Sequence, residues 1–260
     1  MLDSKPTLQT LLEHRSIRKY TGEPISDEML LAVLEAGRAV STSSFLQAAS
    51  VIRVVDKAKR TALRQISCDM SEQEYEQAVQ AGKRLGHAYV EDCAEYLVFC
   101  MDSHRHHQLA DVQTDWTEVA IIGAIDAALM AQNVLAAAES LGLGGVYIGS
   151  LRNDIQRAGQ VLGLPQHVVP LFGLCLGHPD MSSKVNQSQR PRLPLDVLVS
   201  TDTYQAASDA DLAAYNEVVR EYYQGRGLDL DWKAQIAATF GGEVRPFMLD
   251  YLQQQGFCKR

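Results

Sequence analysis

Two short runs of basic residues stand out in a chain that is acidic as a whole. The run His14-Arg15-Ser16-Ile17-Arg18 follows an amphipathic segment, and Arg190-Pro191-Arg192 lies in a polar stretch. Arginine presents a planar fork of donors that suits a phosphate group, and serine and histidine add further donors. Together the two runs would form an anion site, whereas separately they fit a basic helix C-terminus and a solvated loop. Spacing along the chain leaves both interpretations open.

A run of hydroxyl side chains and a glycine-rich segment are the next candidates. Ser41-Thr42-Ser43-Ser44 would line the polar edge of a ligand, but taken alone it favours an N-cap cluster in a loop. The segment Gly142-Leu-Gly-Gly-Val-Tyr-Ile-Gly149 would let a backbone approach a flat ligand closely. It follows a predicted helix and has Tyr147 where the dinucleotide fingerprint requires glycine. A Rossmann site is therefore excluded, and a helix stop with a tight turn is expected.

Patterns for metal binding and for nucleophilic catalysis are weak. His104-Arg105-His106-His107 suggests a metal patch, but adjacent histidines rarely converge on one ion and no other ligand spacing supports them, so we predict no metal. The sequence contains no nucleophile elbow, P-loop or zinc-protease motif, so no side chain is predicted to be catalytic by itself. The five cysteines are scattered and odd in number, which indicates reduced thiols in a cytoplasmic protein.

Composition excludes several classes of protein. With 24 Lys and Arg against 32 Asp and Glu, the net charge of -8 argues against a nucleic-acid partner. The most apolar stretch, 119–135, contains Asp126, Gln132 and Asn133, so it fits a buried helix better than a membrane span. Residues 1–9 lack the basic and apolar regions of a signal peptide. We therefore expect a folded cytoplasmic protein without a membrane partner.

Hydrophobic periodicity predicts helices interleaved with short strands. Ser26 is expected to cap one helix, and Asn153 or Asp154 to cap another that ends at Leu162. Further helices are predicted at 8–14, 57–67, 72–83, 117–140, 209–224, 232–240 and 246–254. Strands are predicted at 51–55, 96–101, 146–148, 168–176 and 195–199, with Pro170 marking an edge strand or a strand start. This order indicates an α+β or α/β domain of three layers.

Taken in order, these segments resemble the FMN-dependent nitroreductase family, in particular its NADPH-dependent, oxygen-insensitive subgroup. The resemblance rests on His-Arg-Ser-Ile-Arg-Lys-Tyr at 14–20, the hydroxyl run that ends in Phe45-Leu46-Gln47, and Glu139-Ser-Leu-Gly-Leu-Gly-Gly-Val-Tyr-Ile-Gly149. It continues with Pro170-Leu-Phe-Gly-Leu-Cys-Leu-Gly177, Arg190-Pro-Arg-Leu-Pro194 and Arg245-Pro-Phe-Met-Leu-Asp-Tyr-Leu252. These motifs are specific as an ordered set, although each of them alone is weak.

The resemblance implies an α+β three-layer sandwich, with a central mixed or antiparallel sheet flanked by helices. It implies a single domain over residues 1–260, in which residues 204–260 form a helical extension that wraps a partner subunit. The long helix 117–140 would lie at the interface of this homodimer, and FMN would bind at the same interface.

The resemblance also implies positions around the FMN. His14, Ser16 and Arg18 would lie on its ribityl phosphate side, with Arg190 and Arg192 completing a phosphate clamp. Thr42, Ser43 and Ser44 would come from the partner subunit, and Tyr147, Ile148, Gly149 and Ser150 would follow one face and edge of the flavin. His87 would stand at the ring edge beside Tyr89, and Arg226 would contact the 2'-phosphate of NADPH. Because Arg15 shares a chain turn with the phosphate anchor, we expect it to stabilise charge at flavin N1.

The implied activity is transfer of electrons from NADPH through FMN to nitroaromatics, quinones or similar acceptors, by a ping-pong two-electron mechanism. The alternative within the same class is an NADPH-flavin reductase that supplies reduced FMN. The alternative of another class is a flavin-binding regulatory dimer without turnover. A yellow protein that NAD(P)H does not bleach would favour that last interpretation.

Overall fold

The computed structural model describes residues 5–260. The described chain divides into two compact units, of which the first comprises residues 5–188 and 247–260, and the second residues 189–246. Each unit has a buried core of its own. The predicted single domain, and the extension 204–260 that would wrap a partner, stay predictions.

A four-stranded antiparallel sheet forms the centre of the first unit. Its strands are β1 (Ala49–Arg53), β2 (Glu95–Asp102), β3 (Gly144–Ile148) and β4 (Val168–Gly177), in the order β1-β2-β4-β3. Every residue of β2 is buried, because helices cover both faces of the sheet. Successive side chains of a strand point to opposite faces, so β1, β2 and β4 contribute to two separate hydrophobic clusters.

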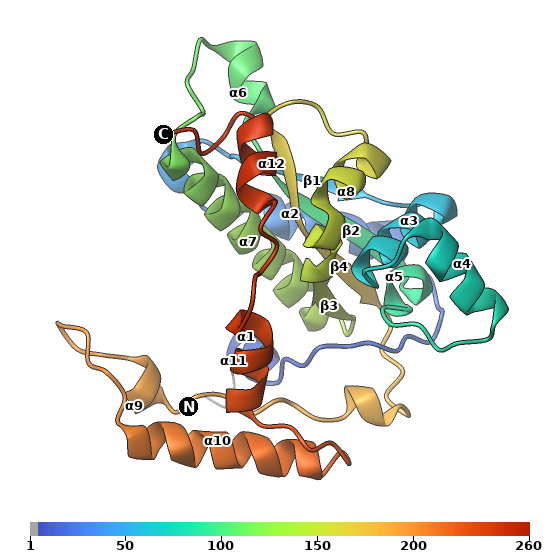
Figure 1. Cartoon of the computed structure of the whole chain (residues 1–260), viewed down its shortest axis with the longest axis vertical. Coiled ribbons are helices and arrows are strands. Elements are labelled where there is room, and N and C mark those ends of the chain that lie inside the picture. The colour runs from blue at the N-terminus through green and yellow to red at the C-terminus, as the bar shows by residue number, and fades with distance from the viewer. Residues whose placement is uncertain (1–4) are drawn as a thin grey trace. The chain divides into compact units, whose positions relative to one another are not determined.

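The first cluster lies between the sheet and two helices, α2 (Asp27–Arg38) and α7 (Thr117–Ser140). The second lies between the opposite face and α3 (Lys57–Ser67), α5 (Tyr89–Asp92), η2 (Gly149–Asp154) and α8 (Ile155–Leu162). Figure 1 shows α2 and α7 on one side of the strands and α3 and α8 on the other. The expected three-layer α+β sandwich is confirmed.

Capping side chains place the helix starts where polar residues were expected. Ser26 Oγ accepts a hydrogen bond from Met29 N, and Asp154 Oδ1 accepts one from Arg157 N. The remaining helices of the first unit are α1 (Pro6–Leu12), η1 (Ser43–Phe45), α4 (Glu72–Gln80), α6 (His104–Leu109), η3 (Lys184–Asn186) and α12 (Met248–Gln254). Of these, α6 was not expected from the sequence.

Helix α7 is long and apolar enough to cross a membrane by length and composition, and it is the one such helix found in residues 5–260. In the structure it packs against all four strands and against α2. Its Asp126 is completely buried and hydrogen-bonded to protein backbone. As expected, α7 is a core helix, and the side of it that faces the sheet is buried.

The second unit consists of α9 (Leu195–Leu198), α10 (Asp209–Gln224) and α11 (Trp232–Phe240). Its core is formed by Tyr215, Val219 and Tyr223 of α10, and Trp232 packs edge-on against Tyr215 with 5.0 Å between ring centroids. The bounds of α10 and α11 match the predicted helices.

Two expectations about strands are wrong. Residues 195–199 form the short helix α9 and not a strand, because Pro194 suits a helix start and residues 189–246 contain no strand for them to pair with. The edge position proposed for Pro170 is also wrong, since β4 lies between β2 and β3. The register between β2 and β4 shifts beside Pro170, since Phe99 pairs with Phe172 and Cys100 with Pro170, and this irregularity accommodates the missing N–H of Pro170.

Candidate functional site

The basic run 14–18 lies along the open edge of the sheet. Ile17 N donates to Gly145 O of β3 at 2.9 Å, and the Ile17 side chain is buried. A Cβ on Gly144 would come within 2.4 Å of Ile17 Cγ1, so this glycine makes room for the run. Gly142, with φ 79°, ends α7. The glycine-rich segment therefore serves helix termination and close packing, as the alternative interpretation of it expected.

His14 is held by a buried carboxylate of α7. Its Nδ1 lies 2.6 Å from Glu139 Oε1, and the Glu139 side chain is 10% exposed. The second oxygen of Glu139 is buried and has no hydrogen-bond partner within residues 5–260. Beside this pair is a cavity of about 400 Å³, whose lining includes Arg15. Arg15 itself donates to Glu13 O at 3.2 Å.

Arg18 follows on the same segment, and a buried asparagine fixes its backbone. Asn186 Oδ1 accepts from Arg18 N at 2.9 Å, while Asn186 Nδ2 donates to Lys19 O and Asp180 O at 2.8 and 2.9 Å. Asn186 is completely buried at the end of the short helix η3. Sequence reasoning missed it, because nothing in its neighbourhood distinguishes it from a solvated loop asparagine.

The structure brings His87 and Tyr89 close to Arg18. Tyr89 Oη lies 2.8 Å from His87 Nδ1. Burial raises the pKa of Tyr89, and the charge of Arg18 opposes that shift. Burial also lowers the pKa of His87, and the charges of Arg64 and Arg18 act in the same direction. This corner therefore combines a neutral imidazole, a protonated phenol and a guanidinium.

The predicted face-and-edge residues continue β3 into η2. Tyr147 Oη donates to Gln132 Oε1 at 3.3 Å, and burial together with the charge of Glu139 raises the pKa of this phenol. Ile148 is buried in the core. Ser150 Oγ is buried and has no hydrogen-bond partner in the described chain, which leaves a polar atom for a ligand to satisfy. Glu139 links Tyr147 to His14, because its carboxylate contacts the His14 ring and its charge contributes to the raised pKa of Tyr147.

The hydroxyl run is not brought to this corner within one chain. Ser43 N donates to Asp126 Oδ1 of α7 at 2.9 Å. His14 binds Glu139 of the same helix, thirteen residues further on. At about 1.5 Å of rise per residue, the two attachment points are about 20 Å apart along α7. Thr42, Ser43 and Ser44 are thus held far from His14 in the same subunit.

The remaining predicted arginines belong to the second unit. Arg190 and Arg192 are exposed, and Arg192 Nη1 donates to Arg190 O at 2.8 Å. The Arg226 guanidinium lies over the Tyr222 ring, 4.7 Å from its centroid. Such stacking orients a guanidinium.

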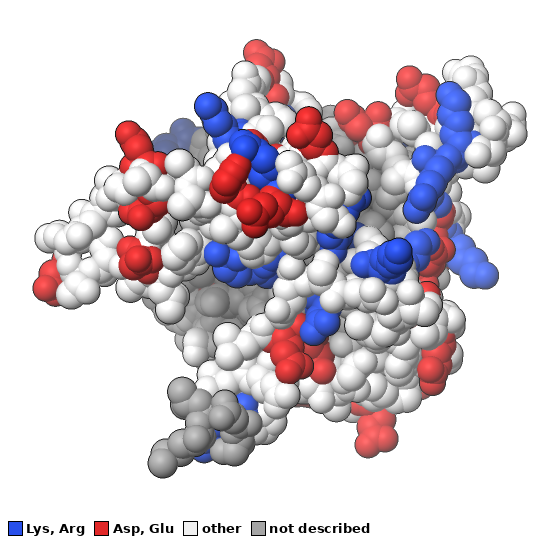
Figure 2. Space-filling view, turned by 90° about the horizontal axis from the view of Figure 1, so that it is seen from below, with Lys and Arg blue, Asp and Glu red and all other residues white. Residues whose placement is uncertain are grey.

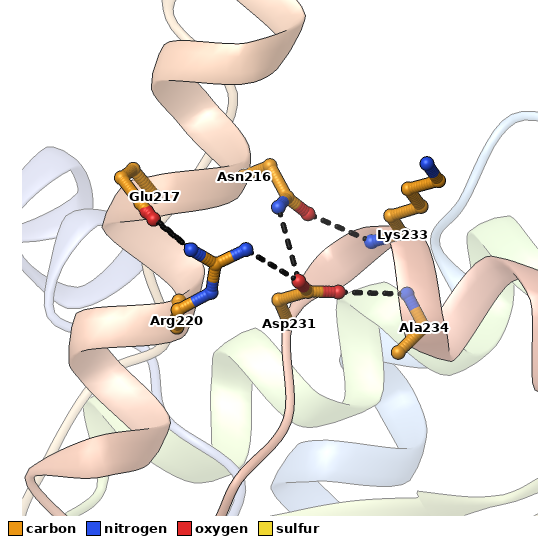
Figure 3. Close-up of polar contacts among 6 residues, drawn as sticks. All are labelled: Asn216, Glu217, Arg220, Asp231, Lys233 and Ala234. Atoms are coloured by element: carbon orange, nitrogen blue, oxygen red, sulfur yellow. Dashed lines mark hydrogen bonds and ion pairs between the residues drawn. The ribbon is translucent and has the colours of Figure 1, made fainter.

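A polar cluster around Asp231 fixes the C-terminal end of the segment 225–230 that carries Arg226. Asp231 caps α11 by accepting from Ala234 N at 2.8 Å, and its other oxygen accepts from Arg220 at 2.9 Å and from Asn216 at 3.2 Å. Asn216 in turn accepts from Lys233 N at 2.8 Å. Figure 3 shows these side chains converging on Asp231. Backbone and side-chain donors together lower the pKa of Asp231 to about 2.

The histidines of α6 serve the fold. The rings of His107 and His167 stack with 3.8 Å between centroids, and His107 Nε2 lies 2.9 Å from Thr114 Oγ1. No group of three or more metal-ligating side chains occurs among residues 5–260. All five cysteines are free thiols. On the face drawn in Figure 2, basic side chains are interspersed with acidic ones.

The residues around Arg18 fit a phosphorylated aromatic ligand such as FMN. A guanidinium and the serine and histidine donors of 14–18 suit a phosphate. A neutral imidazole at His87 and the unpaired hydroxyl of Ser150 suit the polar edge of a flat ring. The donor set lacks the carboxylate or thiolate cluster that a metal would require.

Comparisons with known proteins agree over nearly the whole length. Residues 11–178 match the model of the nitroreductase family, and residues 190–260 match that of the C-terminal domain of the same family. The chain is 44% identical to the NADPH-flavin oxidoreductase of Vibrio harveyi, covering 98% of this chain and 99% of that protein. It is 42% identical to the oxygen-insensitive NADPH nitroreductase of Salmonella typhimurium, with the same coverage.

Solved structures show the same likeness. Nitroreductase A from Vibrio parahaemolyticus superposes with a TM-score of 0.86 at 44% identity, covering 98% of this chain and 99% of that one. The NADPH:FMN oxidoreductase from Vibrio harveyi in complex with NAD+ gives a TM-score of 0.84 at 43% identity, covering 98% of this chain and all of that one.

Proposed function

Because the chain belongs to the nitroreductase family, we propose that this oxidoreductase carries FMN and uses NADPH to reduce nitroaromatics, quinones or similar acceptors. The observation that carries the proposal is identity of 42–44% over 98% of the chain to two enzymes named for NADPH-dependent reduction. The cluster of Arg18, His87 and Tyr89 supports it, since these side chains suit a flavin phosphate and ring edge, and the unpaired hydroxyl of Ser150 offers a further polar contact.

The cofactor-binding residues that we propose are those that the family resemblance implies. His14, Ser16 and Arg18 would bind the phosphate side, together with Arg190 and Arg192. Arg15 would place positive charge near flavin N1, where negative charge develops on reduction. When bound, FMN supplies two-electron transfer between the nicotinamide and the acceptor, which take turns in one site. The protein's own residues would orient the nicotinamide and the acceptor, and Arg226 would bind the 2'-phosphate of NADPH.

The site would be completed in a homodimer. The hydroxyl run is attached to α7 about 20 Å along the helix from the residue that binds His14, which supports a site shared by two subunits. Ile121, Ile125 and Leu129 recur every four residues on α7 and are 48%, 46% and 45% exposed. Such an apolar stripe suits burial against a second copy. We place this dimer in the cytoplasm, since its five thiols are unpaired.

A specific observation favours flavin reduction as the second candidate. The Vibrio harveyi relative is named for flavin as its acceptor, whereas the Salmonella typhimurium relative is named for nitro compounds, and the two identities differ little. Steady-state rates with free FMN and with nitrofurazone as acceptors would separate the two activities. A regulatory dimer without turnover would show neither rate.

The first experiment is an absorption spectrum of the purified protein under argon, before and after NADPH or NADH is added in separate cuvettes. We expect flavin bands that NADPH bleaches faster than NADH. An Arg226→Ala variant should lose that difference, while retaining its flavin bands. A protein that lacks flavin and does not bind added FMN would overturn the proposal.

A further inference from the structure

Residues 42–47 form a loop whose backbone is held in an unfavourable conformation. Ser44, Phe45 and Gln47 have φ values of 48°, 60° and 54°, in the left-handed region that residues with a Cβ avoid. Phe45 at the tip is 83% exposed, so burial of its ring does not offset this cost within the subunit. Other contacts must therefore hold the loop in place.

One set of contacts comes from the inner side. Asp126 of α7 accepts from Ser43 N at 2.9 Å with one oxygen and from Ala48 N at 3.0 Å with the other. Thr42 Oγ1 accepts from Gln47 N at 3.2 Å. These bonds close the base of the loop but leave the carbonyl groups near its end unpaired by α7.

The second set comes from α6, on the outer side. Arg105 Nη2 donates to Gln47 O at 2.9 Å and to Ala49 O at 2.7 Å. His106 Nε2 lies 2.8 Å from Leu46 O, and because a carbonyl only accepts, this nitrogen must carry the proton. Two neighbouring side chains of one short helix thus bind two carbonyl groups at the end of the loop and one at the start of β1.

All of these contacts are made to the loop through backbone groups and the Thr42 hydroxyl. The hydroxyls of Ser43 and Ser44 form no hydrogen bond with any other residue of the described chain, and both residues remain accessible. Strained backbone that surrounding contacts enforce is concentrated at functional sites, where it fixes the direction of side chains. The loop therefore presents two hydroxyls and one aromatic ring in a fixed direction.

We propose that Arg105 and His106 are positioning residues of the flavin site, which hold the loop 42–47 so that its hydroxyls and Phe45 meet the cofactor without rearrangement. The inference rests on the proposed function, because the loop's ligand is the FMN proposed above. A loop that is ordered before binding spares the ligand the cost of ordering it. Loss of either contact should therefore weaken FMN binding more than it changes overall stability.

The test uses Arg105→Leu and His106→Leu in the full-length apoprotein. His106→Gln is the conservative variant, since its amide can still donate to Leu46 O. Gln108→Leu is the matched control, because Gln108 is exposed on α6 and makes no hydrogen bond to the loop. The two readouts are hydrogen exchange of the amides 43–48 and the dissociation constant of FMN from fluorescence quenching, with thermal melting of each apoprotein recorded alongside.

We expect both leucine variants to exchange faster over 43–48 and to bind FMN about tenfold more weakly. His106→Gln and Gln108→Leu should stay within about twofold of the parent protein. Combining Arg105→Leu with Ser43→Ala and Ser44→Ala should cost less affinity than the product of the separate effects, because α6 acts through these hydroxyls. A purely structural contribution of α6 would instead give independent effects.

The outcomes separate the inference from the function on which it rests. A parent protein that binds no FMN would overturn the proposed function and the inference with it. A parent protein that binds FMN, with leucine variants that bind it equally well, would overturn the inference alone. Faster hydrogen exchange with unchanged FMN affinity would also overturn the inference alone, since it would show that α6 orders the loop without affecting how the cofactor binds.

Discussion

At the scale of single residues, the hydrogen bonds of Asp126 explain why a charged residue interrupts the apolar sequence of α7. Asp126 stands in the alanine-rich α7, where its 0% exposure would be very costly for an unpaired carboxylate. Each of its oxygens accepts one backbone N–H, from Ser43 and from Ala48. Asp126 would be costly in a lipid environment, whereas in this fold its two hydrogen bonds connect the loop 42–47 to the core.

Asp126→Ala would leave both amide groups without an acceptor. We expect the free energy of unfolding to fall by about 2–4 kcal/mol, because unsatisfied buried donors retain their desolvation cost. Urea unfolding of the apoprotein measures the change. Asp126→Asn keeps the shape and one carbonyl acceptor and should lose less. If Asp126→Ala were as stable as the parent protein, the two amides would have to find other partners.

At the scale of elements, the α10–α11 pair depends on polar contacts around one side chain. Asp231 caps α11 and pairs with Arg220 of α10, so it connects the two helices across the segment 225–230 (Figure 3). Negative charge at a helix N-terminus is favoured by the helix dipole. The segment with Arg226 is thus fixed at its C-terminal end, and the ring of Tyr222 orients the guanidinium.

The lowered pKa of Asp231 predicts an acid-sensitive contribution to folding. Its pKa is about 2 in the folded protein, against 3.8 for the unfolded reference, so the ionised carboxylate stabilises the fold above pH 4. That contribution is lost as the pH falls from about 4 towards 2. We expect the stability difference between the parent protein and Asp231→Asn to shrink over this interval in denaturant titrations. A difference that stays constant between pH 5 and pH 2.5 would contradict the assigned pKa.

At the scale of the whole molecule, the two groups of expected FMN contacts are held at well-separated points of one helix. Glu139 holds His14, and Asp126 holds Ser43, about 20 Å away along α7. The same helix exposes Ile121, Ile125 and Leu129 on the side of its sequence nearer Asp126. In the homodimer that we propose, this stripe would be buried and the loop 42–47 of one subunit would complete the site of the other.

Ile125→Glu should therefore produce a monomer. A charge in the middle of an apolar interface has to be desolvated without a partner, which costs enough to dissociate the dimer. Sedimentation measures the oligomeric state, and the monomer should also bind FMN more weakly because each site loses its second set of contacts. Glu118→Gln, at an exposed position of the same helix, is the control. A dimer that survives Ile125→Glu would place the interface elsewhere.

Much of the fold was predictable because local signals agreed with one another. Helices at 57–67, 117–140, 209–224 and 232–240 begin and end as predicted, since capping residues and apolar periodicity mark them. The strand predicted at 195–199 failed, because an apolar run has the same pattern in a short exposed helix. Helix α6 was hidden, since its polar sequence carries no periodicity and its contacts come from distant residues.

The sequence by itself determined the family, the three-layer architecture and the residue types of the candidate site, because these follow from ordered motifs and local periodicity. It did not determine which of those residues meet. Only the tertiary structure placed His87 and Tyr89 beside Arg18 and paired His14 with Glu139. The tertiary structure also showed that the loop 42–47 is attached to α7 at Asp126, away from these residues. These relations depend on hydrogen bonds between residues far apart in the chain, and no pattern of nearby residues encodes such contacts.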